Sequence, residues 1–339
     1  MLGGAVGDAL GAPTEFMSLQ DIIRKYGPNG VGDYVEFPDG RGEITDDTQM
    51  VLFIAEGILK AHSPEMNNGS GDAMYTQTFQ ACLRWLDTQN MSIKDSMVKY
   101  KKDPNQSKLV FEKALYKRRA PGISCLTALE KTARNGVWGT VAHPVNDSKG
   151  CGGIMRIAPV GLIREITPGD AFRHGVAVAA MTHGHPEGYL PAGVLACIIA
   201  ALQNGDNTLQ SSIERALNEL ITYNRHENTE KAILQAIRLY ENESPTFENI
   251  ERLGSGWVGE EALAISLFCA LQYSTDFEKG VLLSVNHSGD TDSTGSITGN
   301  ILGLLLGEKA IPQRWIQHLN MEPLIREMAT RMYTNEDLS

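Results

Sequence analysis

The amino-acid sequence predicts an all-α protein with a single domain, residues 1–339. Apolar residues recur at helical spacing in one segment after another, for example between Met50 and Leu59, and this periodicity is typical of amphipathic helices. The alternation of strands with helices that a parallel sheet requires is absent from the sequence. Glycine also repeats at every fourth position in two segments, which places it on one face of a helix. We therefore expect a dozen or more helices.

The N-terminal part contains clear helix boundaries. Pro13 ends the first glycine-rich helix. A capping box, Ser18-Leu-Gln-Asp21, opens the second helix, which ends at Gly27. Residues 27–44 are rich in glycine, and we expect them to form an ordered loop over the site.

The later helices follow the apolar periodicity and the capping signals. The clearest start is Thr167-Pro-Gly-Asp170, which combines a cap, proline at the first helical position and an acid in the first turn. The helices expected after the second one cover residues 46–62, 74–86, 109–117, 124–134, 167–181, 187–203, 208–223, 229–241, 258–273, 276–287, 291–306 and 321–332.

Composition excludes several classes of protein. A net charge of −11 argues against general binding of nucleic acid, which needs a basic surface. No uninterrupted apolar span reaches about 18 residues, so we expect no membrane helix. The five cysteines are widely spaced and form no CxxC pair, as is typical of reduced thiols in a cytoplasmic protein.

The glycine repeats indicate that two helix backbones approach closely. A buried glycine costs a helix roughly 0.5–1 kcal/mol relative to alanine, so several in register need a packing reason. One repeat lies near the N-terminus and the other near the C-terminus, at Gly3, Gly7 and Gly11 and at Gly295, Gly299, Gly303 and Gly307. We expect the start of the C-terminal helix to be held against a neighbouring backbone.

Carboxylates and hydroxyls gather at two helix starts. Each cluster alone fits first-turn acids favoured by the helix dipole. Together, beside the glycine repeats, they indicate a site for two hard cations, because all-oxygen ligands favour Mg²⁺, Mn²⁺ or Ca²⁺ over Zn²⁺. The two ions would share Asp292 as a bridge at a separation of about 3.5–4 Å. The oxygen donors are Thr45, Asp46, Asp47, Asp290, Asp292 and Ser293.

Three further segments are candidates for binding substrate. Residues 149–156 form a glycine-rich loop that runs into an expected apolar helix, which fits either a phosphate cradle or a tight helix entry. Arg156 would hold a phosphate or a structural carboxylate. His183 ends a helix, where a structural role is the alternative, and His287 is expected to orient the carboxylates. Trp257 lies at a glycine-flanked helix start and would face the leaving group of a substrate.

Taken together, these motifs resemble the ADP-ribosylglycohydrolase family, which includes the dinitrogenase reductase-activating glycohydrolase and the ADP-ribosylarginine hydrolases. The motifs that carry the resemblance are GDALGAPTEF (residues 7–16), ITDDT (44–48), GCGGIMR (150–156), TH (182–183), GWVGEEAL (256–263) and SGDTDS (288–293).

The resemblance implies one compact, orthogonal all-α domain with a binuclear Mg²⁺ or Mn²⁺ centre. One ion would be held by Thr45, Asp46, Asp47 and Asp292, and the other by Asp290, Asp292 and Ser293. Glu15 would stand beside the metals, and the catalytic residues would be Glu15, Asp47 and Asp292. The residues that would bind substrate are Gly150, Cys151, Gly152, Gly153, Met155, Arg156, His183 and Trp257.

The implied activity is metal-dependent cleavage of the glycosidic bond between ADP-ribose and a protein side chain, arginine first and serine second. The expected partner is an ADP-ribosylated protein, without nucleic acid or membrane. Two alternatives stay open: an immunity-type protein that neutralises an ADP-ribosylating toxin by binding or by hydrolysis, and a hydrolase of a small ADP-ribosyl metabolite. The sequence departs from some arginine-specific members at Ala120-Pro-Gly-Ile-Ser124, where those proteins carry an aspartate.

Overall fold

The computed structural model describes residues 1–35, 40–63, 72–101, 107–206 and 208–334. Helices form the whole architecture of these residues, and their only extended pairings are two isolated bridges, Gly42 with Leu319 and Gly150 with Val258. The prediction of an all-α domain is confirmed. The α-helices are α1 (Leu2–Gly11), α2 (Leu19–Tyr26), α3 (Asp46–Ala61), α4 (Asp72–Asn90), α5 (Ile93–Tyr100), α6 (Ile123–Asn135), α7 (Ala158–Gly161), α8 (Pro168–Ala180), α9 (Pro186–Gln203), α10 (Leu209–Leu220), α11 (Glu227–Asn242), α12 (Phe247–Glu251), α13 (Gly259–Gln272), α14 (Phe277–Ser284), α15 (Thr291–Leu306), α16 (Gln313–His318) and α17 (Glu322–Thr334). The 3₁₀ turns are η1 (Leu109–Phe111), η2 (Lys113–Tyr116), η3 (Cys151–Gly153) and η4 (Glu308–Ala310).

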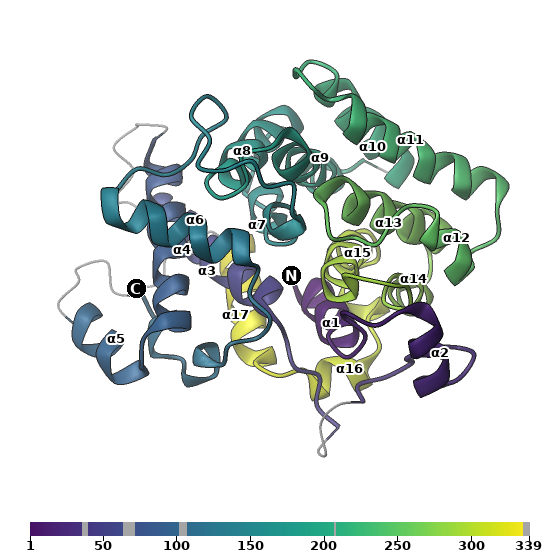
Figure 1. Cartoon of the computed structure of the whole chain (residues 1–339), viewed down its shortest axis with the longest axis horizontal. Coiled ribbons are helices and arrows are strands. Elements are labelled where there is room, and N and C mark those ends of the chain that lie inside the picture. The colour runs from purple at the N-terminus through teal and green to yellow at the C-terminus, as the bar shows by residue number, and fades with distance from the viewer. Residues whose placement is uncertain (36–39, 64–71, 102–106, 207, 335–339) are drawn as a thin grey trace.

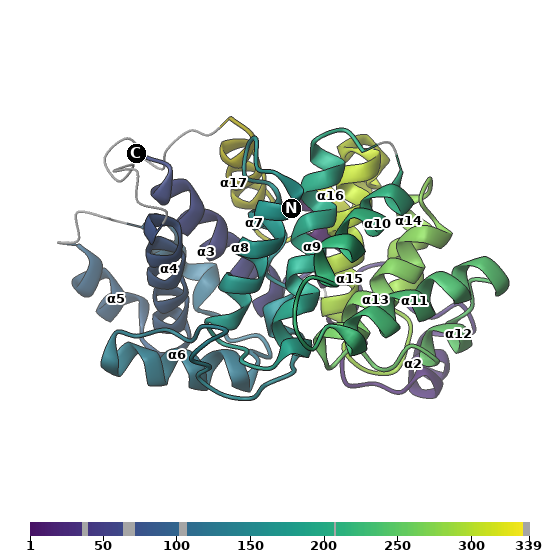
Figure 2. The ribbon, with the colours of Figure 1, turned by 90° about the horizontal axis from the view of Figure 1, so that it is seen from above.

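The helices are arranged in two groups around a central set. Figures 1 and 2 both place α4, α5 and α6 at one end of the molecule and α11 and α12 at the other, with α7, α8 and α9 between them. The helices α1, α3, α9 and α15 are buried over most or all of their length. A helix that is buried all round is mostly apolar or small, and the charged residues that α3 nevertheless buries include Asp46, Asp47 and Glu56. The first and last thirds of the chain therefore meet in the core.

The glycine repeats pack against each other. The sequence predicted that another backbone approaches these faces, but not that the two repeats are partners. A Cβ atom added to Gly7 would lie 2.0 Å from the carbonyl oxygen of Gly295, and one added to Gly299 would lie 2.1 Å from that of Gly3. At Gly11 the carbonyl oxygen of Thr291, the first residue of α15, would be 2.2 Å away. The backbones of α1 and α15 thus touch along their length, and this contact fixes the acidic start of α15.

The helix α9 forms the centre of the apolar core. It has the length and mean hydropathy, 1.2, of a segment that could cross a membrane, but 89% of that window is buried inside the fold. Core helices of this kind have the same composition. The helix predicted over residues 187–203 is confirmed, and it begins one residue earlier, at Pro186.

A few elements differ from the sequence prediction. Residues 109–117 form the two 3₁₀ turns η1 and η2 in place of one α-helix. The helices α5, α12 and α16 were not predicted. The glycine-rich loop leads into η3 and the four-residue α7 instead of a long apolar helix. Part of the loop expected over the site, residues 36–39, lies outside the described residues.

Candidate metal and substrate site

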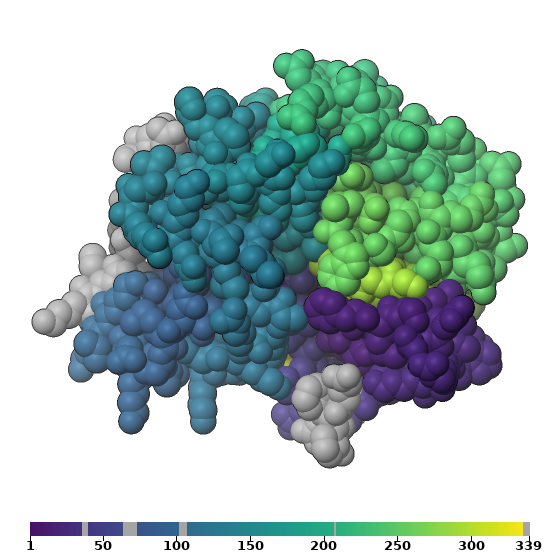
Figure 3. Space-filling model, viewed as in Figure 1, coloured from purple at the N-terminus to yellow at the C-terminus, as the bar shows by residue number. Residues whose placement is uncertain are grey.

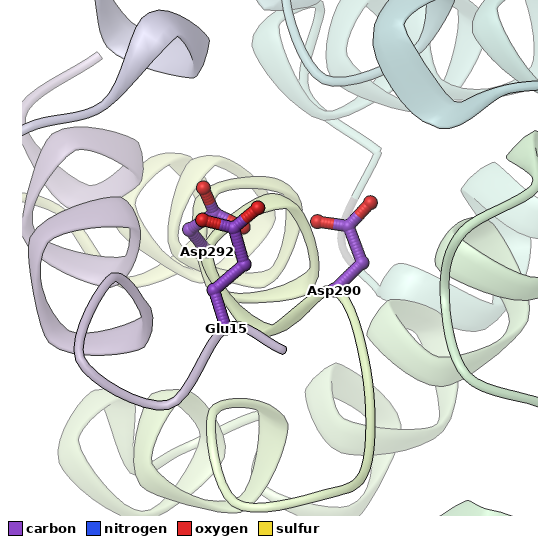
Figure 4. A group of neighbouring side chains, drawn as sticks. All are labelled: Glu15, Asp290 and Asp292. Atoms are coloured by element: carbon purple, nitrogen blue, oxygen red, sulfur yellow. The ribbon is translucent and has the colours of Figure 1, made fainter. Parts of the chain in front are cut away.

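Three carboxylates converge where α1 ends and α15 begins. Glu15 lies on the turn after α1, Asp290 precedes α15, and Asp292 belongs to the first turn of that helix. Figure 4 shows their side chains directed into the same space. One oxygen of each carboxylate lies within 4.8 Å of the others, a spacing that lets all three hold one metal ion. The close packing of α1 on α15 brings together residues that are 275 or more positions apart in the sequence.

The second acidic cluster opens α3, and a buried aspartate holds its turn in place. The amide N–H groups of Thr45 and Thr48 donate to the carboxylate of Asp8, at 3.0 and 3.1 Å, and the Thr48 hydroxyl donates to it as well. Thr45 is the N-cap of α3, and its Oγ1 accepts from the amide of Asp47 at 3.3 Å. Asp8 lies inside the GDALGAPTEF motif, but no role was predicted for it. The signal available was a charged residue on a helix that is otherwise small and apolar.

Burial and mutual repulsion favour the protonated forms of these carboxyl groups. Burial, followed by the charges of Asp292, Asp290, Asp46 and Asp8, raises the pKa of Glu15 to about 10. Desolvation and repulsion from Asp292 raise the pKa of Asp8 to about 7. The same two causes raise the pKa of Asp46, Asp47 and Asp290 well above the ordinary value for aspartate. A site of this kind stores electrostatic repulsion that a bound cation relieves.

The donor set fits hard divalent cations. Oδ1 of Asp47 is buried and has no hydrogen-bond partner among the described residues. The carboxylates of Asp46, Asp47, Asp290 and Asp292 line one cavity together with the hydroxyl-bearing Ser293. Oxygen donors without histidine are the ligands that Mg²⁺ and Mn²⁺ prefer. The residues predicted as metal ligands therefore include a buried oxygen that a cation would satisfy.

The carboxylates form part of a cavity of about 490 Å³. Figure 3, which is viewed as in Figure 1, shows a hollow where the purple N-terminal segment meets the teal and green segments. Most predicted substrate-binding residues line this cavity, whereas Gly153 and Arg156 do not. The lining consists of Glu15, Phe16, Asp46, Asp47, Ala120, Pro121, Gly122, Ile123, Ser124, Cys125, Gly150, Cys151, Gly152, Met155, His183, Trp257, Asp290, Asp292 and Ser293.

The glycine-rich loop is shaped by close contacts to the start of α9. A Cβ atom at Gly153 would lie 2.5 Å from the carbonyl oxygen of Gly188, and one at Gly152 would lie 2.9 Å from Cε1 of His183. The amide of Cys151 donates to the carbonyl of Trp257 at 3.2 Å. The thiol of the same cysteine donates to Oδ2 of Asp290 at 2.7 Å, so the loop is attached directly to the acidic cluster.

Arg156 lies behind the loop and not in the cavity. Its side chain is fully buried, and its Nη2 donates to Oγ1 of Thr182 at 2.6 Å and to the carbonyl of Val178 at 3.3 Å. Oγ1 of Thr182 is in turn 2.8 Å from Nδ1 of His183. The expectation that this arginine holds a phosphate is therefore corrected: its guanidinium orients His183. Burial and the nearby Arg156 charge lower the pKa of His183 to about 3, so the imidazole is neutral at the cavity wall.

An aromatic pair covers one side of the cavity. The rings of Phe16 and Trp257 are stacked, with centroids 5.1 Å apart and an interplanar angle of 25°. Both side chains are partly exposed although they are large and apolar. Phe16 has a positive φ of 65°, a conformation that is uncommon for an aromatic residue and turns its ring towards Trp257. The sequence pointed to Trp257 but not to Phe16, whose role depends on this turn.

The whole chain, from residue 1 to residue 338, matches the model of the ADP-ribosylglycohydrolase family. The chain belongs to this family. The ADP-ribosylarginine hydrolase Tri1 of Serratia proteamaculans is 25% identical to it over 98% of this chain and 77% of that protein. The ADP-ribosyl-[dinitrogen reductase] glycohydrolase of Rhodospirillum rubrum is 24% identical over 95% of this chain and 89% of that protein. A solved structure described as an ADP-ribosylglycohydrolase-related protein complex has the same fold, with a TM-score of 0.63 and 24% identity. The match covers 98% of this chain and 95% of that chain.

Membership of the ADP-ribosylglycohydrolase family confirms the resemblance seen in the sequence. The relatives named above act on ADP-ribosylated arginine or on an ADP-ribosylated protein, by their names. The segment Ala120–Ser124, where the resemblance suggests a departure from some arginine-specific members, lines the cavity. Ala120 has a positive φ of 48° there.

Proposed function

We propose that this protein is a metal-dependent hydrolase that removes ADP-ribose from a protein side chain, arginine in preference to serine. The observation that carries the proposal is the cavity of about 490 Å³, whose floor is a buried carboxylate cluster and whose wall is a glycine-rich turn. This volume lies within the range of about 300–1,000 Å³ that is usual for sites of small molecules and cofactors. Family membership and the names of the two relatives support the same activity.

Each part of the cavity suits a different part of ADP-ribose. The carboxylates would hold the metal ions next to the hydroxyls of the ribose whose bond is cleaved. The turn η3 is the proposed seat of the diphosphate, because glycine leaves the backbone N–H groups accessible to an anion. The neutral His183 borders this turn. The stacked pair of Phe16 and Trp257 offers a flat apolar surface, which suits the adenine better than the leaving group expected for Trp257 from the sequence.

Cleavage at the anomeric carbon passes through an oxocarbenium-like state, which nearby carboxylates stabilise. Two divalent cations held by the predicted ligands would fix the sugar and lower the pKa of water. We assign the proton transfer to Glu15, because its carboxylate is the least buried of the cluster and borders the cavity. The aromatic pair and the loop would exclude bulk water from the reacting bond.

The substitution Asp292→Asn tests the role of the cluster. Asp292 is the proposed bridge between the ions, so kcat should fall by about 10²–10³-fold or more. In EDTA the variant should be at least as stable as the wild type, because the repulsion that Asp292 exerts on its neighbours is lost. Asp276→Asn is the matched control, since Asp276 caps α14 outside the cavity lining and asparagine is also a good cap. Full activity of Asp292→Asn would refute the proposed mechanism.

A further inference from the structure

The unpaired positive charges of this protein gather in one stretch of the chain. Residues 91–135 contain eleven lysines and arginines but four acidic residues, whereas the whole chain has 30 basic and 41 acidic residues. In the described part of the chain, seven exposed lysine and arginine side chains form no ion pair, hydrogen bond or ring contact. Five of the seven lie in this stretch: Lys94, Lys101, Lys113, Arg118 and Arg134. The other two are Lys231 and Lys309.

Exposed cations elsewhere in the structure are mostly paired with acids. A nitrogen of Arg215 lies 3.2 Å from a carboxylate oxygen of Asp206, and one of Arg252 lies 2.8 Å from an oxygen of Glu243. Such pairing is expected in a chain with a net charge of −11, because acids are in excess. The five unpaired side chains instead leave positive charge on the surface, and such charge attracts an acidic partner.

Helix α6 connects this basic stretch to the cavity. Ile123 is the first residue of the helix and lines the cavity. The exposed residues Ile123, Thr127, Lys131 and Arg134 recur at helical spacing, so they share the outer face of α6. Figures 1 and 2 show that α6 runs along the face on which Figure 3 shows the hollow. A protein whose side chain enters the cavity would therefore lie against this helix.

Two more unpaired cations flank the outer face of α6. Arg118 lies just before the helix in the chain. Lys94 follows Asn90 by four residues, and Nδ2 of Asn90 donates to Oε1 of Glu130 on α6 at 3.2 Å. This bond holds the start of α5 beside the later turns of α6. Unpaired positive charge thus lies near both ends of the helix, at Arg118 and at Lys94 and Arg134.

Exposed aliphatic side chains lie at the same two ends. Ile123 is 78% exposed, and Val137, two residues after the end of α6, is 66% exposed. Apolar side chains of this kind can pack against a protein partner. Proteins that bind single-stranded nucleic acid usually present aromatic rings on which the bases stack. The surface therefore suits an acidic protein segment better than a nucleic acid.

We propose that the outer face of α6 and the cations beside it form a docking surface for an acidic segment of the acceptor protein. That the partner is the acceptor rests on the proposed function, because its modified side chain would enter the cavity at the start of α6. Arg118 and Arg134 attract carboxylates of that segment, and Ile123 and Val137 contact its apolar side chains. The enzyme thereby distinguishes acceptor proteins by residues that lie outside the cavity.

Two peptides test the docking surface. Each has a central ADP-ribosylated arginine with three glycines on either side, followed by four glutamates in one peptide and four glutamines in the other. The glutamates reach about 13–25 Å from the arginine, and α6, with 13 residues, is about 20 Å long. Wild-type protein should cleave the glutamate peptide with a kcat/KM about tenfold higher at low salt, since each exposed ion pair contributes about 1.5- to 5-fold. The ratio should fall towards 1 in about 0.5 M NaCl, because salt screens exposed charges.

The variant Arg118→Glu/Arg134→Glu should lower this ratio by about tenfold, because two attractions become repulsions. Both side chains are exposed and unpaired, so the hydrolysis of free ADP-ribosylarginine should stay unchanged. Lys231→Glu/Lys309→Glu is the matched control, since it makes the same change in net charge at exposed, unpaired positions outside the basic stretch. The control should keep the wild-type ratio. Equal ratios in the two variants, with free ADP-ribosylarginine still hydrolysed, would overturn the docking surface and leave the proposed function intact.

Binding of the unmodified glutamate peptide separates the docking surface from the activity. If neither peptide nor free ADP-ribosylarginine is cleaved, the proposed function fails, and fluorescence anisotropy with this labelled peptide decides the docking surface. Binding that Arg118→Glu/Arg134→Glu weakens by about tenfold, and that the control variant leaves unchanged, would support it. Equal binding by the two variants, or tighter binding of an oligothymidylate of about 20 nucleotides than of the peptide, would refute it.

Discussion

The contact between α1 and α15 predicts a large effect for the smallest possible substitution. In Gly7→Ala the new methyl group would lie 2.0 Å from the oxygen and 2.4 Å from the carbon of the Gly295 carbonyl. These are backbone atoms, so relief requires the two helices to separate. Overpacking costs about 1–3 kcal/mol or more, while alanine returns about 1 kcal/mol of helix propensity. We expect a net loss of about 2 kcal/mol in the free energy of unfolding.

Gly303→Ala is the matched control for this prediction. Gly303 lies on the same face of α15 as Gly295, but a Cβ atom added to it would be 3.3 Å from the nearest atom, Cα of Gly3. The stability of the control should stay within about 1 kcal/mol of the wild type, because a contact of 3.3 Å requires the neighbour to move by only a few tenths of an ångström. Urea unfolding of both variants in EDTA gives the difference. Because the separation also moves Asp292 away from Glu15, Gly7→Ala should weaken Mg²⁺ binding. Equal stability of the two variants would refute the account of this contact.

Three further predictions concern buried polar groups. Asp8→Asn should lower the free energy of unfolding by about 1–2 kcal/mol, measured by urea unfolding. Asparagine has a single side-chain oxygen, which must then accept from the donors of both Thr45 and Thr48. Arg156→Met should raise the pKa of His183 in an NMR titration, since the guanidinium charge lowers it. Burial lowers the pKa of His287 from 6.5 to about 4, because the folded protein favours the neutral imidazole. The contribution of His287 to the free energy of unfolding is therefore complete above pH 6.5 and is lost as the pH falls towards 4. The advantage of wild type over His287→Gln should therefore shrink by about 2 kcal/mol between pH 7.5 and pH 5. An advantage that does not change with pH would contradict this reasoning.

Much of the core could be predicted because its signals are local. Glycine at every fourth position has few uses other than close helix packing, so a close backbone approach at both repeats could be predicted from spacing. That α1 and α15 are each other's partners is seen only in the folded chain. The acidic starts of α3 and α15 were predicted from another local signal, the carboxylates and hydroxyls that gather at these two helix starts. Ser92 and Asp95 form a capping pair that would have revealed α5, but the weak apolar face of that helix hid it.

The roles of Asp8 and Arg156 could not be read from the sequence, because they depend on distant partners. Asp8 binds the amides of a turn 37 and 40 residues away. The position of Arg156 after a glycine-rich loop is typical of a phosphate ligand, yet the short turns at η3 and α7 direct it into the core.

The central claim is that a metal-bearing carboxylate cluster cleaves ADP-ribose from a protein side chain. The most direct test measures the release of ADP-ribose from an arginine-modified protein and, in parallel, from a serine-modified one, each with Mg²⁺ or with EDTA. We predict release from the arginine-modified protein with Mg²⁺ and its loss in EDTA. Equal release in EDTA would contradict the metal-dependent mechanism, and no release from either protein would contradict the proposed function.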